Sequence, residues 1–310
     1  MPYLGEITSL LAAMCWTVSS TAFAVASRAA SPLAANQFRL CASLPLLAVL
    51  AVALLGAPWP AGASWAQLAS ASASGLCGLV LGDIGYFYAL AKIGPRLCSV
   101  IMVSWPACVV LIEAGMGRAP SVAVLGGIAL TMAGVVLVLL RSRDDAQWDP
   151  RVTPRQRTLG VLGAALGSVG QAAGFVLAGP AMAADGDVAA LEPLHCTVVR
   201  MATAVVVMQG ATFAQGQGFV MRDVLIRPAA LRSALLGAAF GPIGGVWLSM
   251  FARQEAERSG HVGLSAALMA TTPLFMMPVA WKLYGAPIGW SGTLGTLLAV
   301  GGVTWCLLVR

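Results

Sequence analysis

One apolar run of the sequence carries a carboxylate near its centre. Asp83 lies in the run 66–91, within the tetrapeptide Gly82-Asp83-Ile84-Gly85. On insertion scales a charged side chain at the centre of a bilayer costs roughly 2.5–3.5 kcal/mol, so such a residue is expected to face water or a partner. Asp83 is therefore a candidate for binding a proton or a substrate. The alternative is a protonated side chain that bonds a neighbouring backbone group.

Aromatic and polar side chains inside other apolar runs could line the same site. Trp and Tyr in membrane proteins gather mostly at the two interfaces, so those placed well inside a run are unusual. Their faces can stack on an apolar, aromatic or cationic ligand, although ordinary helix packing explains any single one. The predicted substrate-binding residues are Trp16, Asp83, Tyr86, Ser104, Trp105, Gln171, Trp247, Thr271 and Thr272.

Two prolines occupy corresponding places in two of the apolar runs. Residues 104–106 read Ser-Trp-Pro and residues 271–273 read Thr-Thr-Pro. A proline inside a helix frees a carbonyl and kinks the helix, and the neighbouring hydroxyls can bond that carbonyl or meet a substrate. Pro106 and Pro273 are therefore predicted hinges beside a central cavity. The alternative is that they only shape the bundle.

The sequence offers little for catalysis or for binding a cofactor. None of the seven cysteines forms a CxxC pair, and small membrane-buried hydrophobes are the simplest interpretation. The chain has no GxxxxGK[ST] motif for nucleotide phosphates. An aspartyl protease needs two carboxylates that share a site, and no second Asp lies inside an apolar run. We therefore expect no enzyme activity, no metal and no cofactor.

Composition places these residues in a membrane. Of the 310 residues, 59% are hydrophobic and 10% are charged, and the mean hydropathy is +0.85. Soluble proteins carry about 25% charged residues, so this chain lacks the polar surface to face water on all sides. The net charge is +6, but the arginines lie in short loops, where they set the orientation in the membrane. We expect the lipid bilayer as a partner and no nucleic acid.

Ten apolar runs are long enough to cross the bilayer as helices. About 20 apolar residues span the hydrocarbon core, and a backbone in lipid must satisfy its own hydrogen bonds. The approximate limits are 6–26, 33–55, 66–91, 97–116, 121–140, 158–180, 188–212, 233–252, 262–284 and 288–309. These runs predict an all-α polytopic membrane protein with ten transmembrane helices.

The two halves of the chain repeat one another. A polar linker, residues 141–157, separates a first five-helix repeat, residues 1–140, from a second, residues 158–310. Because five is an odd number, the second repeat must enter the membrane from the opposite side, which makes the two repeats inverted. The ordered matches pair Pro32 and Arg39 with Pro193 and Arg200, residues 82–85 with 241–244, residues 104–106 with 271–273, Ala119-Pro120 with Ala286-Pro287, and Gly134 with Gly301.

These motifs resemble the drug/metabolite transporter superfamily, and in particular its ten-helix EamA-type members. The resemblance rests on a Pro-Leu…Arg entry into the second helix of each half and a Ser/Thr-x-Pro in the fourth. It implies export or exchange of metabolites, amino acids or drugs through a central cavity between the halves. Members are drawn with cytoplasmic termini, whereas the excess of Lys and Arg in the loops on the linker side predicts termini outside.

Arg39 and Arg200 match in the repeat and lie about two turns inside their helices. Long basic side chains extend toward the headgroups, so membrane anchoring is the default expectation for both. A clamp for a substrate carboxylate is the alternative.

Together these features predict a secondary transporter in a bacterial inner membrane. We expect it to export a small metabolite, amino acid or drug-like molecule by alternating access, either uncoupled or coupled to protons through Asp83. A lipid scramblase or pore is the nearest alternative, and an intramembrane enzyme is a more distant one.

Overall fold

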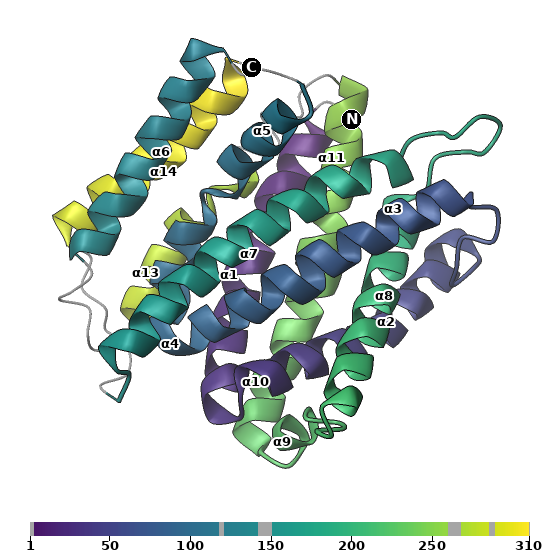
Figure 1. The fold of residues 1–310 in the computed structure, drawn as a ribbon, viewed down its shortest axis with the longest axis horizontal. Coiled ribbons are helices and arrows are strands. Elements are labelled where there is room, and N and C mark those ends of the chain that lie inside the picture. The colour runs from purple at the N-terminus through teal and green to yellow at the C-terminus, as the bar shows by residue number, and fades with distance from the viewer. Residues whose placement is uncertain (1–2, 118–120, 142–150, 260–267, 285–288, 310) are drawn as a thin grey trace.

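The structure is a computed structural model that describes residues 3–117, 121–141, 151–259, 268–284 and 289–309. Apart from one isolated bridge between Asp185 and Val188, the regular structure of these residues is helical (Figure 1). The helices are α1 (Leu4–Ala29), α2 (Pro32–Leu55), α3 (Trp65–Gly75), the π-helix η1 (Leu76–Gly82), α4 (Asp83–Met102), α5 (Trp105–Gly115), α6 (Val122–Arg141), α7 (Pro154–Ala181), α8 (Pro193–Ala214), α9 (Arg222–Leu225), α10 (Pro228–Ala238), the π-helix η2 (Ala239–Trp247), α11 (Leu248–Ser259), α13 (Thr272–Tyr284) and α14 (Trp290–Leu308).

The chain is a multi-pass membrane protein. Within the described ranges, six helical segments are long and apolar enough to cross a bilayer, namely Leu4–Ala29, Pro32–Leu55, Trp65–Met102, Pro154–Ala181, Pro193–Ala214 and Pro228–Glu255. Two shorter apolar helices, Trp105–Gly115 and Val122–Val138, accompany them. The all-helical membrane class predicted from the sequence is confirmed. The count of ten transmembrane helices and the inverted repeat stay predictions.

Local sequence explains where several of these helices begin. Ser64 and Thr153 each form a capping box with the glutamine three residues later, Gln67 and Gln156. The paired side chains satisfy backbone N–H groups that the first turn leaves free. The apolar run 188–212 becomes helical only from Pro193, because a proline suits the first position of a helix and the residue before it prefers an extended backbone.

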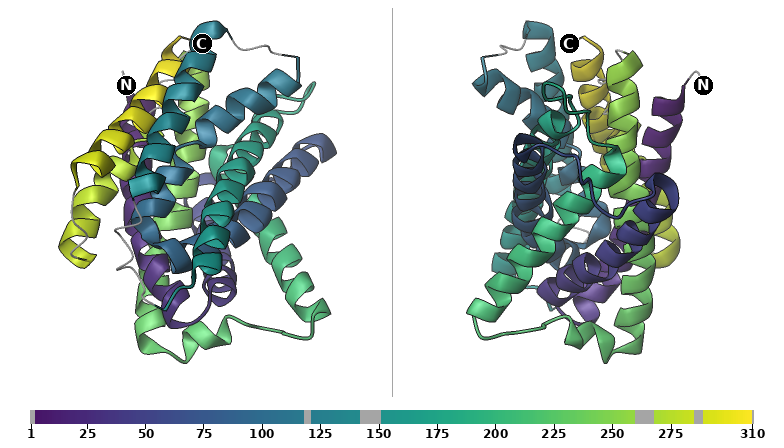
Figure 2. Two further views of the ribbon diagram at one scale, coloured as in Figure 1. Left: turned by 60° about the vertical axis from the view of Figure 1, so that its left-hand side comes forward. Right: turned by 90° about the vertical axis from the view of Figure 1, so that its right-hand side faces the viewer.

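The helices form one bundle in which segments far apart in the sequence lie side by side. The closest pairings join α6 with α14, α7 with α3, η1 and α4, α1 with α10, η2 and α11, and α2 with α8. Figures 1 and 2 show the N- and C-termini at the same end of the bundle and α9 at the opposite end. Each of these pairings joins an element of one predicted half to an element of the other.

Glycines bring some of these helices into backbone contact. A Cβ atom added to Gly163 on α7 would lie 2.6 Å from the carbonyl oxygen of Gly85 on α4. One added to Gly170 would lie 2.5 Å from the Cα atom of Gly82, at the end of η1. Small residues let backbones approach closely in a membrane bundle, where packing rather than burial from water holds helices together.

Candidate functional site

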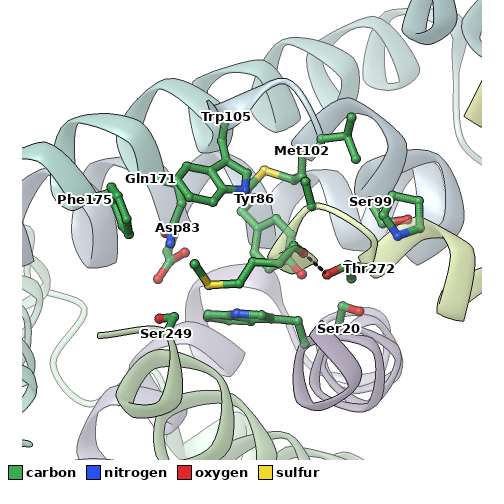
Figure 3. Close-up of a pocket in the computed structure, with 15 residues that line it drawn as sticks. Ser20, Asp83, Tyr86, Ser99, Met102, Trp105, Gln171, Phe175, Ser249 and Thr272 are labelled. Carbon is green, nitrogen blue, oxygen red and sulfur yellow. Dashed lines mark hydrogen bonds between the residues drawn. The ribbon is translucent and has the colours of Figure 1, made fainter. Parts of the chain in front are cut away.

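The structure contains a pocket in the interior of the bundle, and residues from both halves line it (Figure 3). The first half contributes α1, α4, α5 and the turn between α4 and α5, and the second half contributes α7, α11, the first residues of α13 and the residues just before them. The lining residues are Trp16, Ser20, Asp83, Tyr86, Ser99, Met102, Val103, Trp105, Gln171, Phe175, Ser249, Met269, Ala270, Thr272 and Pro273.

Asp83 is positioned by an irregular stretch of helix. The π-helix η1 ends at Gly82 and Asp83 opens α4. A π-helix contains wider turns than an α-helix and occurs mostly at functional sites. Because Gly82 also contacts the backbone of Gly170 on α7, the backbone around Asp83 is held firmly against the second half.

An arginine from α2 holds the Asp83 carboxylate. Arg39 Nη2 donates a hydrogen bond to Asp83 Oδ2 within a salt bridge, and the two side chains are only 3% and 13% exposed. Arg39 also donates to Asn36 Oδ1 at 3.0 and 3.2 Å and lies 5.2 Å from the centroid of the Phe87 ring. The expectation that Arg39 extends to the headgroups is therefore wrong, because a buried carboxylate offers it a stronger partner.

Arg200 is also buried, with 1% of its surface exposed, so the anchoring expectation is wrong for it as well. Its Nη1 donates to Met250 Sδ at 2.9 Å, and a Cβ atom on Gly78 would lie 3.4 Å from its Nη2. The small residue at position 78 thus leaves room for a guanidinium in the interior. A thioether is a weak acceptor, so this arginine is poorly matched where Arg39 is well matched.

Aromatic rings form much of the pocket wall. Trp105 on α5 packs against Phe175 on α7 with ring centroids 5.1 Å apart. Tyr86 meets Phe87 edge-on at 5.9 Å. Behind the wall, Arg253 donates a hydrogen bond to the Phe175 carbonyl oxygen and lies 4.6 Å from the centroid of its ring. Figure 3 shows the Trp105, Tyr86 and Phe175 side chains around the same space as Asp83 and Gln171. Such a surface suits a ligand with an apolar or aromatic body.

Both predicted hinge prolines stand just after a break in the helix. Val103 and Ser104 form a turn before α5, and Ala270 and Thr271 form a turn before α13. Pro106 and Pro273 are each the second residue of the new helix, where a missing N–H costs no hydrogen bond. The structure therefore shows two interrupted helices rather than two continuous helices with an internal proline.

The neighbouring hydroxyls satisfy backbone carbonyls at these breaks. Ser104 Oγ donates to the Ile101 carbonyl at 2.8 Å, and Thr271 Oγ1 donates to the Leu268 carbonyl at 2.6 Å. Thr272 Oγ1 donates to the Met269 carbonyl at 2.9 Å. The sequence predicted that these hydroxyls either bond backbone carbonyls or meet a substrate. All three bond carbonyls in the structure, and Thr272 also lines the pocket.

The structure brings most of the predicted substrate-binding residues to one place. Trp16, Asp83, Tyr86, Trp105, Gln171 and Thr272 line the pocket, as does Pro273. Ser104, Trp247 and Thr271 are not among its lining residues, and neither is Pro106. Trp247 instead packs beside the buried cluster that includes Leu40 and Leu194, because it lies on the face of η2 that meets α2 and α8.

Several lining residues are missing from the set predicted from the sequence. Ser20 and Phe175 follow Trp16 and Gln171 by four residues, so helical spacing could have found both. Ser249 and Met269 have no such signal, because only the packing of α11 and α13 brings them to the pocket. Among the described residues, no group of three or more His, Cys, Asp or Glu side chains could hold a metal ion.

These observations define a polytopic membrane protein with an internal, aromatic and polar binding pocket. The model of the EamA-like transporter family matches residues 3–140. This match places the first half of the chain with the EamA-like transporter family, part of the drug/metabolite transporter superfamily, and it confirms the resemblance drawn from the motifs. No curated protein matches the chain.

One solved crystal structure, whose title says no more than that it is of a protein, has the same fold. It is 19% identical in sequence, the TM-score is 0.59, and the alignment covers 100% of this chain and 99% of that chain. At this identity the likeness establishes the fold alone. Because the alignment runs over both chains almost completely, the architecture extends through the second half as well as the half that the family model matches.

Proposed function

We propose that this chain is a secondary transporter that exports a small metabolite, amino acid or drug-like molecule across a bacterial inner membrane by alternating access. The observation that carries the proposal is the central pocket, which is lined by both halves and contains Asp83 among aromatic rings. Family membership supports transport over catalysis. A pocket in the middle of a bundle, at the junction of two repeats, is where secondary transporters bind substrate.

The close contacts between helices support two inverted halves. Contacts of α7 with η1 and with the neighbouring helices α3 and α4 have counterparts in the contacts of α1 with η2 and α10. The spacing of these contacts along the sequence is the same in both halves. The matching pairs are Gly78–Gly174 with Gly237–Phe23, and Gly82–Gly170 with Gly241–Ser19. Exchange of the two halves turns one set into the other, as expected for repeats related by a pseudo-two-fold axis.

The helix pair α6 and α14 supports the same relationship. Gly134 on α6 approaches Gly295 and Ala299, whereas Gly302 on α14 approaches Gly127 and Thr131. These contacts exchange with each other when Gly134 is matched with Gly302. We therefore propose Gly302, one residue beyond Gly301, as the partner of Gly134 in the repeat.

The topology can be tested directly. Reporter tags at residue 150 and at the C-terminus should lie on opposite sides of the bilayer, because five helices separate them in the proposed arrangement. Tags on the same side would overturn the inverted repeat. The same tags would also decide between termini outside, which the loop charges favour, and termini in the cytoplasm, as in the family.

Transport is tested with the purified protein in liposomes. Compounds that become less toxic to cells overexpressing the protein are first selected, and their uptake by counterflow is then measured. Saturable, solute-selective counterflow supports the proposal. Movement of labelled lipid without solute selectivity would favour the scramblase instead, and equal leakage of unrelated solutes would favour the pore.

The proposed proton coupling needs a separate measurement. If Asp83 carries the coupling proton, Asp83→Asn should abolish the dependence of uptake on a pH gradient and leave exchange intact, because an amide cannot release a proton. Gradient dependence that persists in this variant would mean that Asp83 does not carry the coupling proton. Tyr86→Phe, which removes a hydroxyl from the same wall, is the matched control.

A further inference from the structure

Two buried arginines occupy matching places in the two proposed repeats, but among the described residues only Arg39 has an acidic partner. Arg39 on α2 is paired with Asp83 and Asn36. Arg200 on α8 donates one hydrogen bond to the sulfur of Met250, and its Nε has no hydrogen-bond partner among the described residues. Burying an unpaired charge is costly, so a guanidinium in this environment has a strong tendency to acquire a counter-ion.

Asp83 is the acidic group placed to supply that counter-ion. It is paired with Arg39 and directly follows η1, the element beside which Arg200 lies. The helices fit the same relationship, because the α3–η1–α4 segment packs against α8 at η1 and against α2 at α4. Arg200 Nη2 lies beside Gly78 within η1, and Asp83 directly follows η1.

The stretch between these two points is wound as a π-helix. Residues 76–82 form a π-helix, in which one more residue is wound into the turns than in an α-helix. Conversion of one wide turn to an α-helical turn changes the direction of every following side chain by about 100° relative to the preceding ones. An α-helical winding of η1 would therefore turn Asp83 to another direction, and π-helical turns of this kind occur frequently at functional sites.

We propose that Asp83 exchanges Arg39 for Arg200 during the transport cycle, with η1 as the element that turns it. The present structure is then the Arg39-paired state, in which the hydrogen bond of Arg200 within the described part of the chain goes to the Met250 thioether. This inference rests on the proposed function, because it assigns the two arginines to two states of one cycle. Arg39 and Arg200 act as positioning residues that alternately hold the pocket carboxylate.

A cycle of variants tests the exchange without a known substrate. The melting temperatures of purified full-length Arg39→Gln, Arg200→Gln and the double variant are compared with that of the unaltered protein. Arg200→Gln alone should raise the melting temperature, because it removes an unpaired buried charge. In the Arg39→Gln background the same change should lower it by several degrees, because Asp83 then loses its second partner.

This reversal of sign is the expected result, and additivity would overturn the exchange. If Arg200→Gln has the same effect in both backgrounds, Asp83 pairs with Arg39 alone. If the double variant cannot be purified, adding Asp83→Asn should restore it, since an amide needs no counter-ion. Failure of that third change to restore folding would also contradict the proposal.

The melting-temperature comparison and the transport assay test the exchange and the proposed function separately. If the effects on melting temperature are additive and the protein performs counterflow, the exchange of partners is wrong and the proposed transport function stands. A clear sign reversal in a protein that moves no solute would remove the proposed function and leave an ion pair with two alternative partners. Arg39→Lys and Arg200→Lys complete the comparison, because a retained charge should preserve the pairing in both positions.

Discussion

The segment α3–η1–α4 and the segment α10–η2–α11 have the same construction and different chemistry. Each consists of an α-helix, a π-helix and a second α-helix, and each uses glycines to approach a helix of the other half. Where the first segment has Asp83, the second has Pro242. Asp83 lines the pocket, whereas Pro242 is buried within η2 and does not.

Under the proposed repeat, this difference teaches that the two halves share a scaffold and differ in their polar chemistry. The π-helix recurs with its glycines on both sides of the pocket, as a structural need of both halves would require. The carboxylate and its arginine partner belong to the first half, while the second half supplies Gln171, Phe175 and Ser249. A ligand in this pocket would therefore meet different side chains from the two halves, although the helices around it are similarly built.

Asp83→Ala should produce the largest change in stability, and it removes the residue that distinguishes the first segment from the second. Removing one partner of a buried ion pair costs roughly 3–5 kcal/mol, because the other charge is left uncompensated. We expect the free energy of unfolding to fall by that order, measured by chemical denaturation in detergent. A loss below about 1 kcal/mol would mean that Arg39 does not depend on the carboxylate.

Gly170→Ala should have the next largest effect, and Gly241→Ala is its counterpart. At Gly170 the new Cβ atom meets the backbone of Gly82 at 2.5 Å, whereas at Gly241 it meets the Ser19 hydroxyl at the same distance. Overpacking costs typically about 1–3 kcal/mol, and a serine side chain can rotate away where a backbone cannot. Equal losses of melting temperature for the two variants would contradict this difference.

Trp105→Ala should weaken ligand binding by a moderate factor. An aromatic pair contributes about 0.5–1.5 kcal/mol beyond its buried area, which corresponds to a roughly 2- to 10-fold rise in the dissociation constant. Trp247→Ala is the control, since Trp247 belongs to η2 and packs outside the pocket. Binding of the transported compound is measured by titration in nanodiscs, and an unchanged constant for Trp105→Ala would exclude that ring from the site.

Pro242→Ala should have the smallest effect and sharpen the comparison of the two π-helices. Alanine loosens no charged contact, and where the backbone already suits proline its replacement acts mainly through the unfolded chain, so we expect the free energy of unfolding to change by less than about 1 kcal/mol. Thermal melting beside Asp83→Ala checks this. A loss as large as that of Asp83→Ala would mean that position 242 carries a role that the pocket does not reveal.

Sequence spacing could identify candidates but could not identify their partners. The repeated prolines predicted kinks at two places where the structure has interrupted helices, and the isolated Asp83 predicted a polar point in the interior. The salt bridge between Asp83 and Arg39 joins α4 to α2, and no periodicity within one helix reports which neighbour it meets. For the same reason the burial of Arg39 and Arg200 was not foreseen, because chain position alone favours an arginine that reaches the headgroups.

Other features depended on packing between the halves. Ser249 and Met269 reach the pocket because α11 and the start of α13 pack beside α1. The two π-helices leave no distinct pattern in a run that is apolar and rich in glycine throughout. Conversely, the match of Gly-Asp-Ile-Gly with Gly-Pro-Ile-Gly indicated that these two regions correspond. The first tetrapeptide spans the end of η1 and the start of α4, and the second lies within η2.

The most direct test of the account is whether the pocket opens to each side of the membrane in turn. Ser249, which lines the pocket, is changed to Cys in a protein whose native cysteines have been replaced, and a membrane-impermeant thiol reagent is added to one side of the vesicles at a time. An exposed position on the surface, Gln215→Cys, reports access of the reagent to its own side. The account predicts that the thiol at position 249 reacts from either side and that the transported compound protects it. Reaction from one side alone, with no protection, would contradict alternating access through this pocket.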